Sequence, residues 1–189
     1  MNILTLKNSY IAKGGNRKVY LHPKDVNKCI KIENKNGTIR KSNKTEYIEL
    51  SKLSCNDFYT KNYGFVNTNL GKGLVFELIK NSDNSISLTL EEFVKKYSIT
   101  DNNLIDRLNQ FKKYFFDIQI MIADLHSRNI LVQMDKNCVK KFIICDGITA
   151  KKGIDMRKFM YTKLLKKLYI KRKFRKLYRE LIKISNQKI

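Results

Sequence analysis

The spacing of apolar residues changes once along this chain, and the change limits the folds that it can adopt. Residues 1–79 contain short runs typical of strands, separated by turn-forming residues, with a single helical pattern. Residues 80–189 are dominated by apolar residues at helical spacing. We therefore expect an α+β protein made of a β-rich part, 1–79, and a helical part, 80–189.

The first part should form several strands and one helix. Apolar residues at Tyr47, Leu50 and Leu53 have the spacing of a helix, and Gly14 and Gly15 indicate a tight turn between two strands. The expected strands in 8–33 are 9–12, 18–21 and 28–32, residues 62–79 again have strand character, and the expected helix is 40–54.

The second part should form three helices and a hairpin. Two short apolar runs, 129–132 and 141–145, flank a polar turn, which is typical of a β-hairpin. Asp101 is placed to cap the helix that follows it. The expected helices are 88–97, 104–122 and 155–184.

The expected hairpin would bring three polar residues together. Asp124 and Asn129 precede its first strand, and Asp146 follows its second strand. Phosphoryl transfer from ATP needs such a set, because a carboxylate orients the attacking hydroxyl and oxygen ligands hold Mg²⁺ against the phosphates. Each residue alone is better explained as an ordinary turn residue. Their order and spacing together favour a site for ATP and magnesium.

The first part supplies groups that could hold the phosphates. Gly14 and Gly15 would let the backbone approach a phosphate, although a glycine pair between strands is usually a simple turn. Lys31 carries a charge within an apolar strand pattern. A strand lysine usually faces solvent, but here a partner is available. Glu46, on the next helix, is the expected partner, and Glu49 is its rival.

The charge of the chain is strongly positive. It has 39 lysines and arginines against 17 acidic residues, a net charge of +22. Such a field attracts phosphate-rich partners. Residues 151–189 are the most basic, with a peak at 171–176. The segment is explained either as a helix with a solvated basic face or as a contact for an anionic membrane, a phosphorylated glycolipid or nucleic acid. No nucleic-acid motif accompanies the charge, so we do not expect that partner.

The order of these motifs resembles that of the protein-kinase-like superfamily. The stretch DLHSRNIL, from Asp124, is similar to its catalytic loop D-x-x-x-x-N. The resemblance implies a minimal two-lobed fold with a reduced C-terminal helical lobe. It places Asp124 as the catalytic aspartate, Asn129 and Asp146 as magnesium ligands, and Lys31 and Glu46 as the phosphate-holding pair. His126, inside the loop, is explained either as a packed loop residue, which is the favoured interpretation, or as a group that neutralises the γ-phosphate or positions the acceptor.

Three stretches resemble the YrbL family of bacterial kinase-like proteins, linked to the PhoP regulatory network. They are GGNRKVYLHPKDVNKCIKI at 14–32, GLVFELIKNSDNSISLTLEEF at 73–93, and the pattern ILV…CDGI. Lipopolysaccharide core kinases that phosphorylate heptose form a related branch. The resemblance implies that adenosine binds at a hinge, residues 76–79, which includes Glu77, and that Gly14 and Gly15 lie over the phosphates.

Several departures from the superfamily pattern bear on the function. Ala12 and Arg17 occupy flanking positions of the glycine loop, Gly147 replaces the phenylalanine of D-F-G, and no A-P-E motif is present. Because 43 residues follow Asp146, we expect no activation segment.

These features together predict an ATP-dependent kinase whose acceptor is a hydroxyl, with a sugar of a bacterial surface glycan ahead of a protein side chain. A non-catalytic nucleotide-binding regulator and a basic nucleic-acid-binding module are the alternatives. No signal peptide or membrane-spanning run is visible, and we expect a cytoplasmic protein, peripheral to the inner membrane if the basic segment binds it.

Overall fold

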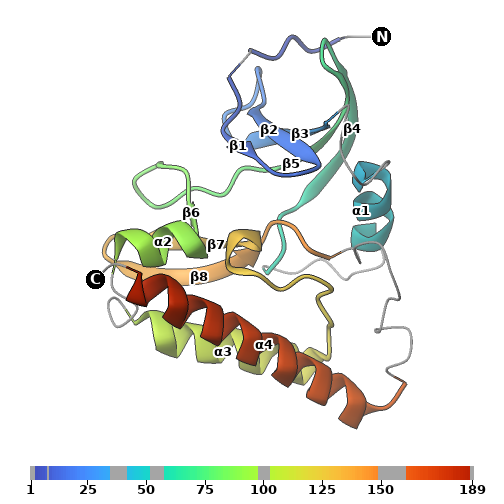
Figure 1. The fold of residues 1–189 in the computed structure, drawn as a ribbon. Helices are drawn as coiled ribbons and strands as arrows, with labels where there is room; N and C mark the ends of the chain where they lie inside the picture. The colour runs from blue at the N-terminus through green and yellow to red at the C-terminus, as the bar shows by residue number, and fades with distance from the viewer. Residues whose placement is uncertain are drawn as a thin grey trace. The chain divides into compact units, whose positions relative to one another are not determined.

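The computed structural model describes residues 3–7, 9–34, 42–51, 58–97, 103–148 and 161–187. The chain divides into two compact units, residues 1–79 and residues 80–189. Figure 1 labels the elements of both units.

The first unit is built on a five-stranded antiparallel sheet with the order β1-β2-β3-β5-β4. Ile30 and Leu74, on the two neighbouring central strands, are fully buried. Alternating apolar residues place one set of side chains on each face. The strands are β1 (Ala12–Lys13), β2 (Arg17–Leu21), β3 (Lys28–Glu33), β4 (Asn62–Thr68) and β5 (Gly71–Glu77).

One strand prediction needs correction, because the predicted strand 9–12 is reduced to the two residues of β1. The strand character predicted for 62–79 is confirmed as two strands, β4 and β5, with a turn at residues 69–70 between them. Thr68 stabilises that turn through its hydroxyl, which donates to the carbonyl oxygen of Gly71 at 2.6 Å. Gly71 has a φ of +112°, which favours glycine at that position.

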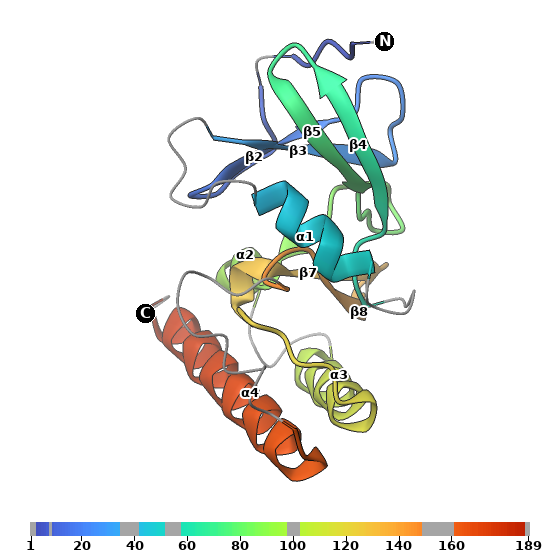
Figure 2. The same ribbon diagram turned by 90° about the vertical axis from the view of Figure 1, so that its right-hand side faces the viewer.

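The helix of the first unit, α1 (Ser42–Ser51), is buried through polar residues rather than through its apolar residues. Asn43 and Glu46 are its buried residues, whereas Tyr47 is 41% exposed. Figure 2 shows α1 beside the sheet of this unit. Leu53, which we expected on the apolar side, lies outside the described residues. The buried polar side indicates that the helix serves a polar site.

The second unit combines a three-stranded sheet, β6-β7-β8, with three α-helices among its described residues. The hairpin prediction is confirmed, because β7 and β8 pair antiparallel from Ile130↔Ile144 to Asp135↔Cys138. Its elements are β6 (Leu88–Thr89), α2 (Leu90–Lys96), α3 (Leu104–Ile118), the short 3₁₀ helix η1 (Ser127–Asn129), β7 (Ile130–Asp135), β8 (Cys138–Ile144) and α4 (Lys163–Asn186).

The core of this unit is a cluster of phenylalanines. Phe111 packs edge-on or tilted against Phe115, Phe142 and Phe174, with ring centroids 4.9, 5.5 and 6.0 Å away. The four rings come from α3, β8 and α4, so they join both helices to the hairpin. Aromatic pairs at such distances add to the hydrophobic contribution of burying the rings.

The helix boundaries differ from those predicted for physical reasons. The helix predicted at 88–97 begins at Leu90, because Thr89 and Glu92 form a reciprocal N-terminal cap. The helix predicted at 104–122 ends at Ile118, where Gln119 adopts a left-handed conformation. Asp101, the predicted cap of that helix, lies outside the described residues. The helix predicted at 155–184 is described as Lys163–Asn186, with Thr162 as its N-cap.

The last helix, α4, lies along α3 on the outside of the hairpin in Figure 1. Ile170, Phe174, Leu177 and Leu181 are its buried residues. Of the helices that the structure describes, none has a long enough apolar stretch to cross a bilayer.

Candidate functional site

Lys31 and Glu46 form a buried ion pair in the first unit. The Nζ atom of Lys31, on β3, lies 3.0 Å from Oε1 of Glu46, on α1, and both side chains are almost fully buried. Of the two glutamates considered above, Glu46 is therefore the one that pairs with Lys31. The ring of Phe76 lies below the ammonium group, 4.0 Å from Nζ to the centroid. Ion pair and ring together fix the position of the charge.

Arg17 shares Glu46 with Lys31, a feature that sequence analysis did not predict. Its guanidinium, on β2, donates to Oε2 of Glu46 and, at 3.3 Å, to Oδ1 of Asn43. One carboxylate thus bridges two cations, and the cluster keeps a net positive charge. This is the charge that a phosphate-binding site requires.

Asn43 and Glu33 attach the start of α1 to the sheet. The side-chain amide of Asn43 donates to the carbonyl oxygen of Lys31 at 2.9 Å. Oε1 of Glu33 accepts from the backbone N–H of Asn43 at 2.7 Å, so a strand residue caps the helix. These bonds place Glu46, one turn further along α1, against Lys31.

Cys29 is buried from solvent beside this cluster. Burial raises the pKa of its thiol to about 11. The side chain lies on β3, two residues before Lys31, and its Sγ lies 3.9 Å from the carbonyl oxygen of Glu77. A low dielectric around the cluster strengthens every charge interaction in it.

The glycine turn is a simple loop between β1 and β2. The backbone N–H of Gly14 donates to the carbonyl oxygen of Arg17 at 2.8 Å. Asn34 ties the turn to β3, because its amide donates to the carbonyl oxygens of Gly14 and Gly15 at 3.2 and 3.1 Å. A Cβ built on Gly15 would meet nothing within 4 Å. The protein's own packing therefore does not require glycine there.

Glu77 ends β5 and bonds to its neighbouring strand segment. Its backbone N–H donates to the carbonyl oxygen of Lys61 at 2.9 Å, and its Oε2 accepts from the N–H of Lys61 at 3.4 Å. The next N–H, of Leu78, donates to the carbonyl oxygen of Asn27 at 2.8 Å. The side chain of Glu77 thus helps to hold the backbone at Lys61 against the end of β5.

In the second unit, Asp124 and Asn129 lie in the loop before β7, and Asp146 follows the end of β8. Hydrogen bonds join these two segments. The amide nitrogen of Asn129 donates to the carbonyl oxygen of Asp124 at 2.9 Å and lies 3.4 Å from its Oδ2. The N–H of Asp124 donates to the carbonyl oxygen of Gly147 at 2.8 Å. The loop before β7 and the end of β8 are therefore held together, with two carboxylates and one amide in the same place.

Gly147 fits where no other residue would. Its φ is +90°, and a Cβ built there would lie 2.3 Å from the carbonyl oxygen of Asp124 and 2.8 Å from Nδ2 of Asn129. Its N–H donates to Oδ1 of Asp146 at 2.7 Å, which fixes that carboxylate. Glycine at 147 thus lets the two ends of the site approach each other closely.

His126 caps η1 and contacts α4. Its Nδ1 either accepts from the N–H of Arg128 at 3.3 Å or, when protonated, donates to Oε1 of Glu180 at 3.1 Å. Fully buried Ser127 donates to the same Oε1 at 2.5 Å. These contacts give His126 a part in holding the loop, and they show a second residue, Glu180, that sequence analysis missed.

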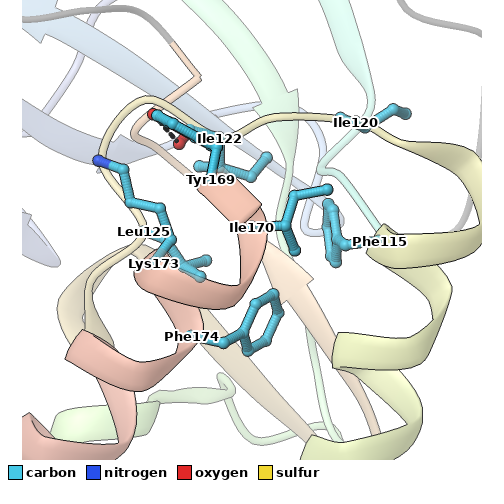
Figure 3. A pocket seen from close by; sticks show the side chains of 8 residues that line it. All are labelled: Phe115, Ile120, Ile122, Leu125, Tyr169, Ile170, Lys173 and Phe174. Carbon is cyan, nitrogen blue, oxygen red and sulfur yellow. Dashed lines mark hydrogen bonds between the residues drawn. The ribbon is translucent and has the colours of Figure 1, made fainter. Parts of the chain in front are cut away.

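Two more side chains of α4 hold the start of the same loop. The hydroxyl of Tyr169 donates to the carbonyl oxygen of Ile122 at 3.0 Å, the bond drawn in Figure 3. Lys173 donates to the carbonyl oxygen of Ala123. The seam beneath them, in Figure 3, is lined by Phe115, Ile120, Ile122, Leu125, Tyr169, Ile170, Lys173 and Phe174, and encloses only about 10 Å³. Such a space is about one water in size. These residues pack the loop against α3 and α4.

Glu91, His126 and Glu180 place ligand atoms within 4.8 Å of one another. Their spacing would suit a metal ion, but each group has a protein partner. Glu91 pairs with Lys95 at 2.5 Å and with Arg128 at 3.4 Å, and the bond from Lys95 lowers its pKa. We therefore interpret this group as an anchor for the loop.

Asn129 and Asp146 fit a hard cation better. An amide and a carboxylate are the oxygen donors that Mg²⁺ takes from proteins. The turn fixes both residues, since Asn129 bonds to Asp124 and Asp146 bonds to Gly147. The fixed donors suit a cation that is also bound by phosphates.

Comparison with known proteins identifies a family and a fold. A model of the family described as "PhoP regulatory network protein YrbL" matches residues 3–182. Two curated proteins named YrbL, from Escherichia coli strain K12 and Shigella flexneri, are each 32% identical over 148 residues, which is 74% of this chain and 70% of theirs.

Among solved structures, Rad53 residues 1–466 in complex with AMP-PNP matches with a TM-score of 0.52 and 17% identity. The match covers 75% of this chain and 37% of that chain, so the protein spans little more than a third of the length of this structural relative. At this identity the likeness concerns the fold alone. The fold is a minimal kinase-like α+β fold, as the sequence predicted.

Proposed function

Because this chain belongs to the YrbL family and has a kinase-like fold, we propose that it binds ATP with magnesium and transfers a phosphoryl group to a hydroxyl. The observation that carries this proposal is the pair of polar clusters, one in each unit. The first has a buried lysine fixed by a helix glutamate, and the second has two carboxylates and an amide in one turn. These are the groups that phosphoryl transfer from ATP uses.

Each residue has a defined role in the proposal. Lys31, held by Glu46, contacts the α- and β-phosphates, and Gly14 and Gly15 let the backbone lie over them. Adenosine binds at residues 76–79, where Glu77 holds the sheet edge. Magnesium, when bound, neutralises the phosphate charge.

In the second unit, Asn129 and Asp146 hold the metal. Asp124 accepts the proton of the acceptor hydroxyl and orients its oxygen. His126 keeps the loop in place through its contact with Glu180.

The acceptor that we propose is a sugar hydroxyl of a bacterial surface glycan, such as the core of lipopolysaccharide. The net charge of +22 favours an acceptor that already carries phosphate. The protein would then work in the cytoplasm, at the inner membrane where such glycolipids are assembled. A protein hydroxyl is the second choice.

One observation favours a second function, a non-catalytic nucleotide sensor. Arg17 takes a flanking position of the glycine loop and bonds to Glu46, which it shares with Lys31. The carboxylate of Glu46 is thus paired with Arg17 as well as with Lys31. In this alternative the cluster binds nucleotide, and no phosphoryl transfer follows.

The test combines binding with turnover. We expect wild-type protein to bind ATP in calorimetry when magnesium is present and to label core oligosaccharides with phosphate from ATP. Asp124→Asn should lower turnover by about 10²-fold or more with little change in ATP affinity, because Asp124 orients the acceptor. Asp146→Asn should weaken the binding of magnesium and ATP.

Three outcomes would decide among the proposals. ATP binding without transfer to any glycan or protein would favour the sensor. No ATP binding by folded protein would exclude both functions. Turnover that survives Asp124→Asn would show that the base is another residue.

A further inference from the structure

The face of α4 that points away from the core carries exposed apolar residues. Leu164 is 67% exposed, Leu168 is 54% exposed and Tyr161, just before the helix, is 80% exposed. The buried residues of α4 begin only at Ile170. An α-helix turns about 100° per residue, which places Leu168 about 160° from the buried Ile170 and about 120° from the buried Phe174, with Leu164 about 120° from Ile170. These leucines therefore do not belong to the core of the unit.

Basic residues continue the same outer face along the helix. Arg172, Arg175 and Arg179 follow Leu168 at intervals of three and four residues, and all three are exposed. Lys171 and Lys176 flank them and are exposed as well. The whole helix contains ten lysines and arginines and a single glutamate, Glu180. The outer face of α4, defined here by Leu164, Leu168, Arg172, Arg175 and Arg179, is thus apolar at its start and cationic beyond it.

Lys173 does not belong to this face. We expected it to face solvent with the other residues of 171–176, but it is half-buried and donates to the carbonyl oxygen of Ala123. The correction follows from helix geometry, because Lys173 lies about 100° away from Arg172 and next to buried Phe174. The cationic face is therefore narrower than the sequence suggested, and its charges are separate from those that hold the loop.

We propose that the outer face of α4 docks on the surface of an anionic lipid bilayer, with the leucines inserted between the headgroups. A bilayer of this kind offers an apolar layer beneath a layer of negative charge, which complements both parts of the face. Binding requires neither ATP nor phosphoryl transfer, so this proposal does not rest on the proposed function.

Other partners match the face less well. Nucleic acid would complement the arginines but would leave Leu164 and Leu168 without an apolar contact. A second copy of the chain would bring two strongly cationic helices together, and like charges would oppose such a pair. An anionic bilayer complements the apolar and the cationic residues together.

The test is co-sedimentation with vesicles of phosphatidylcholine, with and without phosphatidylglycerol, at low and high salt. We expect the wild-type chain to bind the anionic vesicles at least about tenfold more tightly than the neutral ones, and less tightly as salt rises. Leu164→Glu/Leu168→Glu should weaken binding at least about tenfold, because the apolar contact is lost. Arg172→Glu/Arg175→Glu should do the same, because the charge contact is lost.

A matched control separates this face from general charge. Lys61→Glu/Lys140→Glu changes the net charge by the same amount as the arginine variant, at exposed residues that lie outside α4. It should weaken binding much less. Circular dichroism would verify that every variant is folded.

A single tryptophan gives an independent measurement, because the chain has none. The fluorescence of Leu164→Trp should shift to shorter wavelength on anionic vesicles, as the ring leaves water. Wild-type binding to neither vesicle would overturn the proposal, and so would a leucine variant that binds like wild type. Tighter binding to RNA or duplex DNA than to anionic vesicles would overturn it in favour of nucleic acid.

Discussion

The two polar clusters of this protein are built by different means. The cluster around Glu46 in the first unit consists of buried side-chain charges, with Lys31 and Arg17 bonded to one carboxylate. The cluster around Asp124 in the second unit consists mainly of bonds to backbone groups, closed by a glycine. A charge cluster depends on each partner's charge, whereas a backbone turn depends on its shape. Different substitutions should therefore disrupt the two clusters.

The largest effect should follow from removing the shared carboxylate. Glu46→Ala leaves two cations without their partner in a buried place, and we expect a loss of about 3–5 kcal/mol in the free energy of unfolding. Lys31→Met in the same chain should recover part of it, because one of those cations is removed. Urea unfolding followed by circular dichroism measures both. Glu49→Ala, three residues along α1, is the control. If Glu46→Ala lowers the free energy of unfolding no more than Glu49→Ala does, the proposed pairing is wrong.

A smaller effect should follow from filling the turn in the second unit. Gly147→Ala adds a Cβ 2.3 Å from the carbonyl oxygen of Asp124 at a φ of +90°, and we expect a loss of about 2–4 kcal/mol from the clash and the strain together. Gly64→Ala is the control, because Gly64 has a φ of +86° and open space around it. It should lose about 1 kcal/mol. Equal losses in urea unfolding would show that the close approach at 147 is unimportant.

The smallest effect should come from a bond between α4 and the loop. Tyr169→Phe removes the donor to the carbonyl oxygen of Ile122, and we expect a loss of about 1 kcal/mol. Hydrogen exchange should become faster in residues 122–129. Tyr178→Phe is the control, because its hydroxyl bonds to Asn109 on α3 and not to the loop. If both variants speed exchange in the loop equally, α4 does not hold it through Tyr169.

Local patterns predicted most of the secondary structure. The hairpin of β7 and β8 followed from two apolar runs around a polar turn, and the structure confirms it. Helix ends were predicted less well, because they depend on single residues such as Gln119, whose left-handed conformation ends α3.

The polar clusters were predicted only in part. Lys31 and Glu46 stood out because a lysine in an apolar strand pattern had a partner available on the next helix. Arg17, Asn43 and Glu180 did not stand out, because nothing in their local sequence distinguishes them from solvated residues. Arg17 and Glu46 are 29 residues apart, and Ser127 and Glu180 are 53 apart. Pairings over such intervals depend on how the elements pack.

The sequence by itself determined the order of strands and helices, the resemblance to the YrbL family and the positions of the glycine turn and of the loop from Asp124 to Asn129. These depend on residues close together in the chain, where periodicity and turn preferences act. Only the tertiary structure decided that α1 is buried through Asn43 and Glu46, that α4 holds the loop before β7, and that Leu164 and Leu168 face outward. Which side of a helix is buried depends on what packs against it, and that is set by residues far away in the sequence.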